Sequence, residues 1–232
     1  MIPKKIHYCW FGRNELPAMA KKCIASWKKY CPDYEIIEWN EDNFDVNMNG
    51  YTKMCYEEKK YAFLSDYVRL VVVAEHGGIY FDTDVEVIKP IDRLLEHDAF
   101  YCFETNEYVA TGLGFGSVAH SPSVEAMVHA YDFLLKGDQG TRGCPRLNTQ
   151  ALLPLGLKQD GSLQMVGGAQ ILPVDCMNPF DPTTGSLYKT ANTVSIHWYS
   201  AAWLSPWRRL RVRIMRPLHR IFGVDAFKRF RK

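Results

Sequence analysis

The first half of the chain alternates short apolar-rich runs with longer segments of helical period. Residues 5–10 and 35–39 have the length and composition of strands. Between them, residues 17–30 place their apolar side chains on one stripe with lysines opposite, which is the period of an amphipathic helix. This order of strand, helix and strand predicts an α/β fold with a mostly parallel sheet and helices on both faces.

A second helix is predicted over residues 61–76, and its more apolar composition indicates deeper burial. It ends at Gly77 and Gly78, where a left-handed residue commonly terminates a helix. Residues 79–81 follow as a short apolar strand that runs directly into Asp82. Because α/β sheets bind ligands at the carboxyl ends of their strands, the chemistry is expected here.

The second half of the chain is less regular. Residues 99–103 and 113–115 are predicted as strands, and Ser121 followed by Pro122 begins a helix whose apolar face extends to Leu135. Residues 136–160 are rich in Gly, Pro and polar side chains and are predicted to form a long loop. No internal repeat or low-complexity linker divides the chain.

Composition favours one globular domain over residues 1–204 with a basic tail over residues 205–232. The chain has 232 residues, 47% of them hydrophobic and 23% charged, which is enough to bury a substantial core. Its start lacks the apolar stretch of a secretory signal, and the longest apolar run, residues 70–74, cannot span a bilayer. Seven cysteines without the close spacing of zinc ligands or redox pairs are expected to be reduced core thiols in a cytoplasmic protein.

The net charge of +2 conceals an asymmetry between the body and the tail. Residues 203–232 contain eight Arg, two Lys and one Asp, a net +9, which leaves −7 for residues 1–202. An acidic body argues against binding to nucleic acid. The basic tail is therefore expected to meet an anionic partner separate from the catalytic face.

From Trp207 onward the tail combines arginines with an apolar side at helical spacing. Such a helix can lie in a membrane interface, although Pro217 must interrupt or kink it. The alternative is a solvated helix that packs its apolar stripe on the acidic body. We favour an anionic membrane surface, because the density of arginine exceeds what a docking helix needs. The apolar side consists of Leu210, Ile214, Leu218, Ile221 and Phe222.

The strongest local feature is the acidic pair Asp82 and Asp84, which follows an apolar strand and a double glycine. In an extended segment, residues two apart face the same side, so these carboxylates should converge on one point. They offer the hard oxygen ligands that Mg²⁺ and Mn²⁺ take. Such a cation can neutralise a diphosphate leaving group. Alone, this spacing is more often a solvated turn, but its position after a buried strand favours a metal site.

The predicted second helix adds Asp66 and Arg69, three residues apart and therefore on one face. From spacing alone, a surface ion pair that contributes little to stability is the more common interpretation. The functional alternative is that Asp66 accepts hydrogen bonds from sugar or ribose hydroxyls, while Arg69 offers its planar guanidinium to a donor molecule.

Three segments in this order closely resemble glycosyltransferase family 32. They are residues 2–12 (IPKKIHYCWFG), 63–70 (FLSDYVRL) and 77–84 (GGIYFDTD), all within roughly the first 105 residues. The family includes capsular-polysaccharide sugar transferases and Golgi initiating mannosyltransferases, and it is related to the catalytic domains of the large glucosylating toxins. The resemblance implies a Rossmann-like nucleotide-sugar transferase fold of the GT-A type, with retaining chemistry.

The resemblance also implies roles for individual residues. Trp10 would stack on the nucleotide base, Asp66 and Arg69 would contact the donor sugar, and Tyr80 would line the nucleotide pocket. Asp82 would face the ribose and the metal, and Asp84 would be a direct metal ligand. Catalysis would depend on Asp82, Asp84 and Arg69. The structural alternative for Trp10 and for Tyr80 is an aromatic residue of the core.

Residues 196–203 (IHWYSAAW) resemble the closing motif of the family. His197 would complete the metal site, and an imidazole ligand suits Mn²⁺ better than Mg²⁺. Without the acidic pair, a lone histidine on an apolar strand would be a core residue. Trp203 matches the motif, but Ala202 stands where the family has serine, so Ser200 is the candidate substitute for that donor contact.

Two weaker features remain open. Gly112, Gly114 and Gly116 alternate along a predicted strand, which could let a substrate approach the backbone, but close packing explains them equally well. Asn148 lies where the family has a loop near the acceptor, and the match there is loose.

Together these features predict transfer of a hexose or N-acetylhexosamine from a nucleotide-diphosphate sugar, UDP-linked by resemblance to bacterial members, to a glycan acceptor. The acceptor is expected to be lipid-linked, in capsular or surface polysaccharide synthesis at the inner face of the plasma membrane. One rival is a haloacid-dehalogenase-type phosphatase, which wants Thr or Val where this chain has Glu86. The other is a membrane-surface adaptor without catalysis, which leaves the acidic pair and His197 unexplained.

Overall fold

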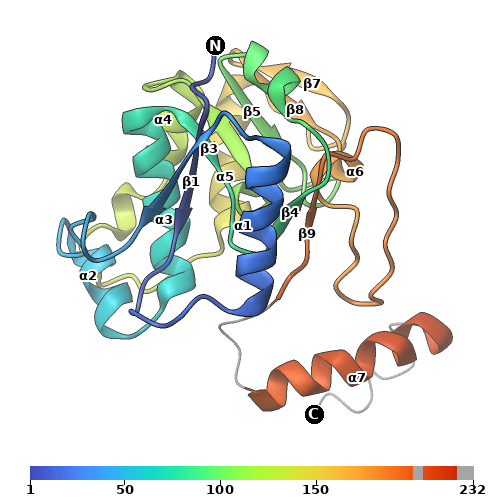
Figure 1. The fold of residues 1–232 in the computed structure, drawn as a ribbon. Helices are drawn as coiled ribbons and strands as arrows, with labels where there is room; N and C mark the ends of the chain where they lie inside the picture. Colours follow the sequence, from blue (N-terminus) through green and yellow to red (C-terminus); the bar gives the residue numbers. More distant parts are fainter. Residues whose placement is uncertain (201–205, 224–232) are drawn as a thin grey trace.

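The computed structural model describes residues 1–200 and 206–223 (Figure 1). A seven-stranded sheet forms the centre, in the order β2-β1-β3-β6-β5-β8-β7. Its strands, in chain order, are β1 (Lys5–Cys9), β2 (Glu35–Trp39), β3 (Gly78–Tyr80), β5 (Ala99–Cys102), β6 (Phe115–Ser117), β7 (Gln164–Val166) and β8 (Ala169–Leu172).

Five of these seven strands run in the same direction. β1 is parallel to β2 and to β3, and β5 is parallel to β8. β6 lies antiparallel between β3 and β5, and β7 is antiparallel to β8. The expected mostly parallel sheet is therefore confirmed, with β6 and β7 as the reversed strands.

The helices cover both faces of the sheet, as expected. Adjacent residues of β5 show the division: Tyr101 packs into one apolar core and Phe100 into the other. The first core includes residues of α2, α3, α4 and α5, and the second includes residues of α1 and α6. The described α-helices are α1 (Ala18–Tyr30), α2 (Gly50–Glu57), α3 (Tyr61–His76), α4 (Pro122–His129), α5 (Cys144–Leu152), α6 (Val174–Met177) and α7 (Pro206–Phe222).

A second, two-stranded sheet carries the segment after the acidic pair. β4 (Val85–Val87) pairs antiparallel with β9 (Ser195–His197), with Val85 opposite His197. Trp27 of α1 lies beneath it, fully buried, and donates its indole N–H to the Val85 carbonyl at 2.7 Å. The pairing of β4 with β9 brings Val85 and His197, which are 112 residues apart, into direct contact.

The end of α3 confirms the predicted glycine cap. Gly77 has φ +63°, in the left-handed region that glycine adopts without strain, and its N–H bonds to the Val73 carbonyl at 2.9 Å. The buried His7 ring of β1 contacts the Gly77 carbonyl through Nε2 at 2.9 Å. The double glycine thus turns the chain sharply from α3 into β3, and Asp82 lies just beyond the end of β3.

Three expectations for the second half were wrong. The helix that begins at Pro122 ends at His129 and does not extend to Leu135, and a 3-10 turn, Asp132–Leu134, follows it. Residues 136–160 are not one long loop, because α5 occupies Cys144–Leu152. Its buried Cys144, Leu147 and Leu152 supply a helical face, and Pro145 fits a first-turn position, but the surrounding polar residues masked this short pattern. The predicted strand over residues 113–115 is instead a 3-10 turn, Thr111–Leu113, followed by β6, so Gly112 lies outside the strand.

All seven cysteines are free and buried, which agrees with their predicted place in the core. Within residues 1–200 and 206–223, no helix is both long enough and apolar enough to cross a bilayer. α7 contacts the body through its polar side: Arg216 Nε donates to the Pro182 carbonyl at 3.0 Å, and His219 Nδ1 lies 3.3 Å from the Thr183 carbonyl.

Replacing Trp27 with alanine should lower the free energy of unfolding by about 3 to 5 kcal/mol, because it empties a large buried site and orphans the Val85 carbonyl. Urea denaturation monitored by circular dichroism measures this loss. Met19→Ala, on the exposed side of the same helix, is the control and should change little. A loss below about 1 kcal/mol for Trp27→Ala would contradict the packing described here.

Candidate active site

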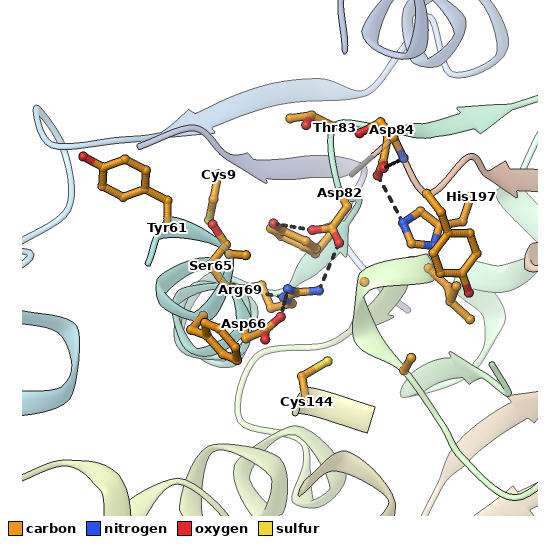
Figure 2. A pocket seen from close by; sticks show the side chains of 18 of the residues that line it. Cys9, Tyr61, Ser65, Asp66, Arg69, Asp82, Thr83, Asp84, Cys144 and His197 are labelled. Carbon is orange, nitrogen blue, oxygen red and sulfur yellow. Dashed lines mark hydrogen bonds and ion pairs between the residues drawn. The ribbon is translucent and has the colours of Figure 1, made fainter. Parts of the chain in front are cut away.

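A pocket of about 550 Å³ opens at the carboxyl ends of β1 and β3 (Figure 2), a size typical of small-molecule sites. Nine residues singled out from the sequence line it: Trp10, Asp66, Arg69, Tyr80, Asp82, Asp84, Gly112, His197 and Ser200. Trp203 lies outside the described residues. Sequence positions from 10 to 200 thus meet at one edge of the sheet, where an α/β fold places its ligand.

The two acidic residues converge by a different route from the one expected. Residues 82–84 form a turn between β3 and β4, in which the Val85 N–H bonds to the Asp82 carbonyl at 3.0 Å, rather than an extended segment. The Asp82 side chain turns towards Arg69 and Tyr80, and the Asp84 side chain turns towards His197. Each carboxylate therefore has its own set of partners.

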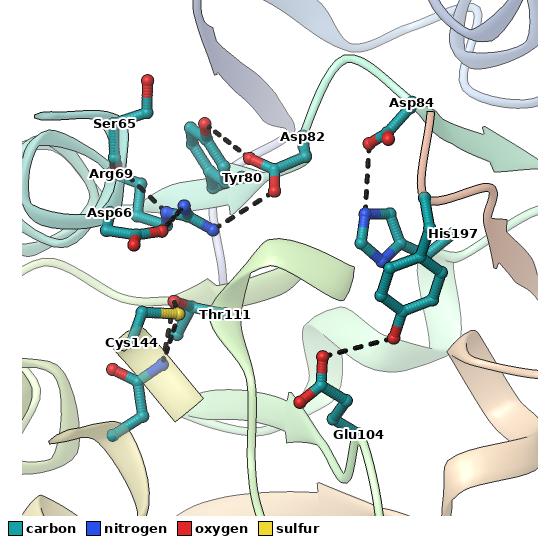
Figure 3. A network of polar contacts seen from close by, with 12 residues as sticks. Ser65, Asp66, Arg69, Tyr80, Asp82, Asp84, Glu104, Thr111, Cys144 and His197 are labelled. Carbon is teal, nitrogen blue, oxygen red and sulfur yellow. Dashed lines mark hydrogen bonds and ion pairs between the residues drawn. The ribbon is translucent and has the colours of Figure 1, made fainter. Parts of the chain in front are cut away.

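Asp82 is held by two groups from neighbouring elements (Figure 3). The Tyr80 hydroxyl donates to Asp82 Oδ1 at 3.0 Å, and Arg69 Nη1 lies 3.4 Å from Asp82 Oδ2. The Arg69 guanidinium also lies over the Tyr80 ring, 5.1 Å from its centroid. Tyr80 is thus a buried aromatic residue of the core that also contacts Asp82.

Asp66 and Arg69 form a buried ion pair, not the surface pair that their spacing alone favoured. Arg69 Nη2 contacts Asp66 Oδ1, and the Arg69 side chain is only 3% exposed. Arg69 Nε also donates to the Ser65 carbonyl one helical turn back, at 3.0 Å. One guanidinium is thus shared by two carboxylates, which leaves one negative charge uncompensated.

Gly112 gives this charge cluster its space. A Cβ at Gly112 would lie 2.6 Å from Asp82 Oδ2 and 2.9 Å from Arg69 Nη1, closer than side chains tolerate. The glycine therefore permits the contact between Asp82 and Arg69. Close packing, one of the two explanations left open for this residue, is correct, and the packing partner is the site itself.

Asp84 is held by the last strand of the body and the turn that follows it. His197 Nε2 lies 3.1 Å from Asp84 Oδ1, and the Ser200 backbone N–H donates to Asp84 Oδ2 at 2.7 Å. The Trp198 N–H donates to the Asp84 carbonyl at 3.0 Å. Ser200 thus contacts Asp84 through its backbone.

The electrostatics of the acidic residues follow from these contacts. Burial raises the pKa of Asp66 to about 6 and also raises the pKa of Asp82, and Arg69 opposes both shifts. Burial alone would raise the pKa of Asp84, but His197 and the Ser200 N–H hold it well below its usual range. Burial would lower the pKa of His197, but the adjacent Asp84 carboxylate raises it.

The site suits a divalent cation of the Mg²⁺ or Mn²⁺ kind. Among the described residues, Asp82, Asp84 and His197 form the group of potential metal ligands, and their ligand atoms all lie within 4.8 Å of one another. The two carboxylates offer the oxygen ligands that such cations take, and the imidazole adds a nitrogen ligand. The excess of carboxylates over Arg69 also favours a cation for charge balance.

Several pocket residues had not been found from the sequence. Glu104 accepts from the Tyr199 hydroxyl at 3.2 Å, and the Tyr199 ring packs on His197 with centroids 4.0 Å apart. Cys144 faces Asp66 and Arg69 across the pocket in Figure 2. Tyr199 lies in the closing motif and could have been chosen there, but Glu104 and Cys144 carry no local signal.

At the other end, aromatic and small side chains line the pocket. Trp10 is half-buried, and its indole N–H donates to the Asn14 carbonyl at 2.6 Å. Tyr61 and Phe63 of α3 line the same end. Trp10 thus contributes a partly exposed aromatic residue to the pocket.

Part of the chain, including α3 and the acidic pair, is similar to known proteins. Residues 17–101 match the model of a family described as a glycosyltransferase sugar-binding region containing a DXD motif. Inositol phosphoceramide mannosyltransferase 3 of Schizosaccharomyces pombe is 31% identical over 103 residues, covering 43% of this chain and 29% of that protein. Human alpha-1,4-N-acetylglucosaminyltransferase is 35% identical over 92 residues, covering 38% and 24%. The chain thus spans less than a third of the length of these relatives.

A solved structure described as PaToxG glycosyltransferase superimposes with a TM-score of 0.52 at 18% identity, covering 66% of this chain and 69% of that chain. At this level of identity the likeness concerns the fold, and it confirms the GT-A type. The matches of residues 17–101 and of the curated relatives confirm the resemblance to glycosyltransferase family 32.

Gly112→Ala should weaken Mn²⁺ binding about tenfold or more, because the new methyl group displaces the Asp82 carboxylate from its place beside Arg69. Electron paramagnetic resonance of free Mn²⁺ measures the affinity. Gly143→Ala is the matched control, since Gly143 lines the same pocket and a Cβ there meets nothing within 4 Å. Equal affinities for the two variants would contradict the described packing.

The ion pair between His197 and Asp84 should give the metal-free protein a pH-dependent stability. Its contribution is complete between about pH 4 and pH 6.5, the ordinary pKa values of Asp and His. It is lost as pH rises through the raised pKa of His197, and as pH falls through the depressed pKa of Asp84. His197→Gln should therefore cost about 1 to 2 kcal/mol near pH 6 and less above pH 8. Urea denaturation with chelator across pH tests this, and a pH-independent difference would refute it.

Proposed function

We propose that this chain is a metal-dependent glycosyltransferase that moves a hexose or N-acetylhexosamine from a nucleotide-diphosphate sugar to a glycan acceptor. The observation that carries the proposal is the meeting of Asp82, Asp84 and His197 beside the buried Arg69. Both aspartates and Arg69 lie in the segment that matches a DXD glycosyltransferase region. The partial sequence coverage leaves the activity of the whole protein as an inference from this site.

Different residues of the pocket bind different parts of the donor. Trp10 stacks on the base, and Tyr80 supports the nucleotide end through its contact with Asp82. Asp66 and Arg69 hold the donor sugar, where the guanidinium offers its planar donors and the carboxylate accepts from hydroxyls. Ser200 lies at the diphosphate end, since its backbone already contacts Asp84. Resemblance to bacterial members favours UDP as the nucleotide.

Asp82, Asp84 and His197 would hold the cation, and Mn²⁺ fits this set better than Mg²⁺. When bound, the cation neutralises the charge that develops on the departing diphosphate. Arg69 stabilises the same charge from the protein side, from a buried position where its interaction is strong.

The proposed reaction retains the anomeric configuration. A hydroxyl of the acceptor forms a bond to the anomeric carbon from the side on which the bond to the diphosphate breaks, and its proton passes to a phosphate oxygen of the leaving group. No protein nucleophile is required for this route. The protein binds and orients both substrates and stabilises the leaving group.

The proposed setting is synthesis of capsular or surface polysaccharide, with a lipid-linked acceptor at the cytoplasmic face of the plasma membrane. We treat residues 1–204 as the catalytic domain and residues 205–232 as a basic tail for an anionic membrane surface. Support comes from α7, whose exposed apolar residues include Leu210 and Ile214. An adaptor without catalysis would leave the buried charge cluster of the pocket without a purpose.

Nucleotide release should identify the donor. Native protein with Mn²⁺ and no acceptor is expected to release nucleotide slowly from one member of a panel of UDP-, GDP- and CMP-sugars. Chelator and Asp84→Ala should each reduce the rate at least about a hundredfold, because they remove the charge stabilisation of the leaving group. Asp42→Asn, which alters an exposed ion pair with Arg13, is the control and should retain the rate. If no donor is turned over but p-nitrophenyl phosphate is hydrolysed, the phosphatase replaces this proposal.

Retention can be tested separately once the donor is known. Proton NMR of the sugar at the first turnover should show the anomeric configuration of the donor, since attack occurs on the face of the leaving group. A product of inverted configuration would exclude attack from the side of the leaving group and would leave the transferase assignment intact.

A further inference from the structure

α7 is tied to the candidate active site by a short piece of chain. The Ser200 N–H bonds to Asp84, and α7 begins at Pro206. Six Cα steps separate these residues, so Pro206 lies at most about 22 Å from Ser200. The first turn of α7 is therefore confined to the neighbourhood of the pocket.

A second connection holds the other half of α7. Arg216 lies over the Phe180 ring, 5.1 Å from its centroid, and Phe180 packs against Trp198 with ring centroids 5.3 Å apart. Trp198 follows directly after the pocket residue His197 in the sequence. His219, which is buried, adds its contact with the Thr183 carbonyl. Both halves of α7 are thus positioned relative to the metal ligands.

These contacts use one side of the helix and leave its apolar side outside. At 100° per residue, the outward residues lie together on the side opposite Arg216 and His219. They are Trp207, Leu210, Ile214 and Ile221, which are 80%, 46%, 55% and 71% exposed. The alternative in which this apolar stripe packs on the acidic body does not agree with these exposures.

The chemistry of α7 matches an anionic bilayer. Its seventeen residues, Pro206–Phe222, contain six arginines and no acidic residue, beside an exposed apolar stripe. An interfacial helix needs both parts, because the apolar side chains enter the acyl boundary while the arginines meet anionic headgroups.

The direction of the sheet fixes which end of the molecule would face that bilayer. In Figure 1, the N-terminus lies at one end and α7 at the other, and β1 runs from the first towards the second. Cys9 and Trp10, at the carboxyl end of β1, line the pocket. In Figure 1 this end of β1 lies on the side of the molecule on which α7 lies.

We propose that α7 lies in the surface of an anionic bilayer and turns the carboxyl edge of the sheet, with its pocket, towards the membrane. This orientation deepens the proposed function, and what it implies for the acceptor rests on that function. The acceptor is then a membrane lipid with a short glycan, because its reacting hydroxyl must lie within about 20 Å of the headgroups. A long glycan would place its growing end beyond the pocket.

Energy transfer from a fluorophore on the protein to labelled lipid tests the orientation. The seven native cysteines are buried, so a cysteine introduced at an exposed position is labelled selectively. Glu15→Cys places the label near the pocket, and Glu96→Cys places it at the opposite end of the sheet; both positions are exposed. With vesicles of phosphatidylglycerol and phosphatidylcholine, transfer should be stronger from the first variant. Equal or reversed transfer overturns the proposal.

Full-chain variants test the anchoring surface. Leu210→Ser with Ile214→Ser should reduce binding to the same vesicles about tenfold or more, and pure phosphatidylcholine should bind the native protein weakly. Leu163→Ser, at an exposed leucine outside α7, is the matched control and should bind like the native protein. Failure of the native protein to bind anionic vesicles, or equal binding by all variants, also overturns the proposal.

The two proposals can fail independently. Nucleotide release in solution, without vesicles, is measured on the native protein and on the double variant Leu210→Ser with Ile214→Ser. If the native protein releases nucleotide but lacks the predicted orientation on vesicles, the membrane-facing pocket is rejected and the transferase is kept. If the native protein is oriented as predicted but releases no nucleotide from any donor, the transferase is rejected, and with it the inference about the acceptor.

Discussion

The guanidinium of Arg69 is the group on which the rest of the pocket depends. It is almost fully buried, and it bridges Asp66 of its own helix to Asp82 at the end of β3. Removing one partner of such a buried pair leaves a charge without compensation, which typically costs about 3 to 5 kcal/mol. The position of α3 against the sheet, the absence of a side chain at Gly112 and the Tyr80 hydroxyl all serve this arrangement. The helix, the strand and the turn are thereby fixed relative to one another.

Local features of the site could be predicted from the sequence because each depends on neighbouring residues. The helix over 61–76, its glycine cap and the short strand before Asp82 all appeared where periodicity and capping placed them. The mostly parallel sheet followed from the same alternation of strand and helix. Motif resemblance added His197 and Ser200, which spacing alone could not have joined to an acidic pair more than a hundred positions earlier.

What the sequence could not provide depends on contacts between distant segments. Burial of the Asp66 and Arg69 pair is set by neighbouring elements, whereas their spacing fitted a surface pair equally well. Glu104 enters the pocket through Tyr199, 95 positions later, and no local pattern announces that contact. α5 was missed because three buried apolar residues in a polar stretch are too few for a clear period.

The pairing of β4 with β9 has a consequence for the order of events as the chain is made. Asp82 and Asp84 leave the ribosome long before His197, and the third candidate ligand arrives only when β9 docks beside β4. Because the paired residues Val85 and His197 are far apart in the sequence, this contact is expected to form late in folding. The nascent protein therefore holds an incomplete set of ligands during most of its synthesis, and occupancy of the site by a cation would report that the whole body has closed.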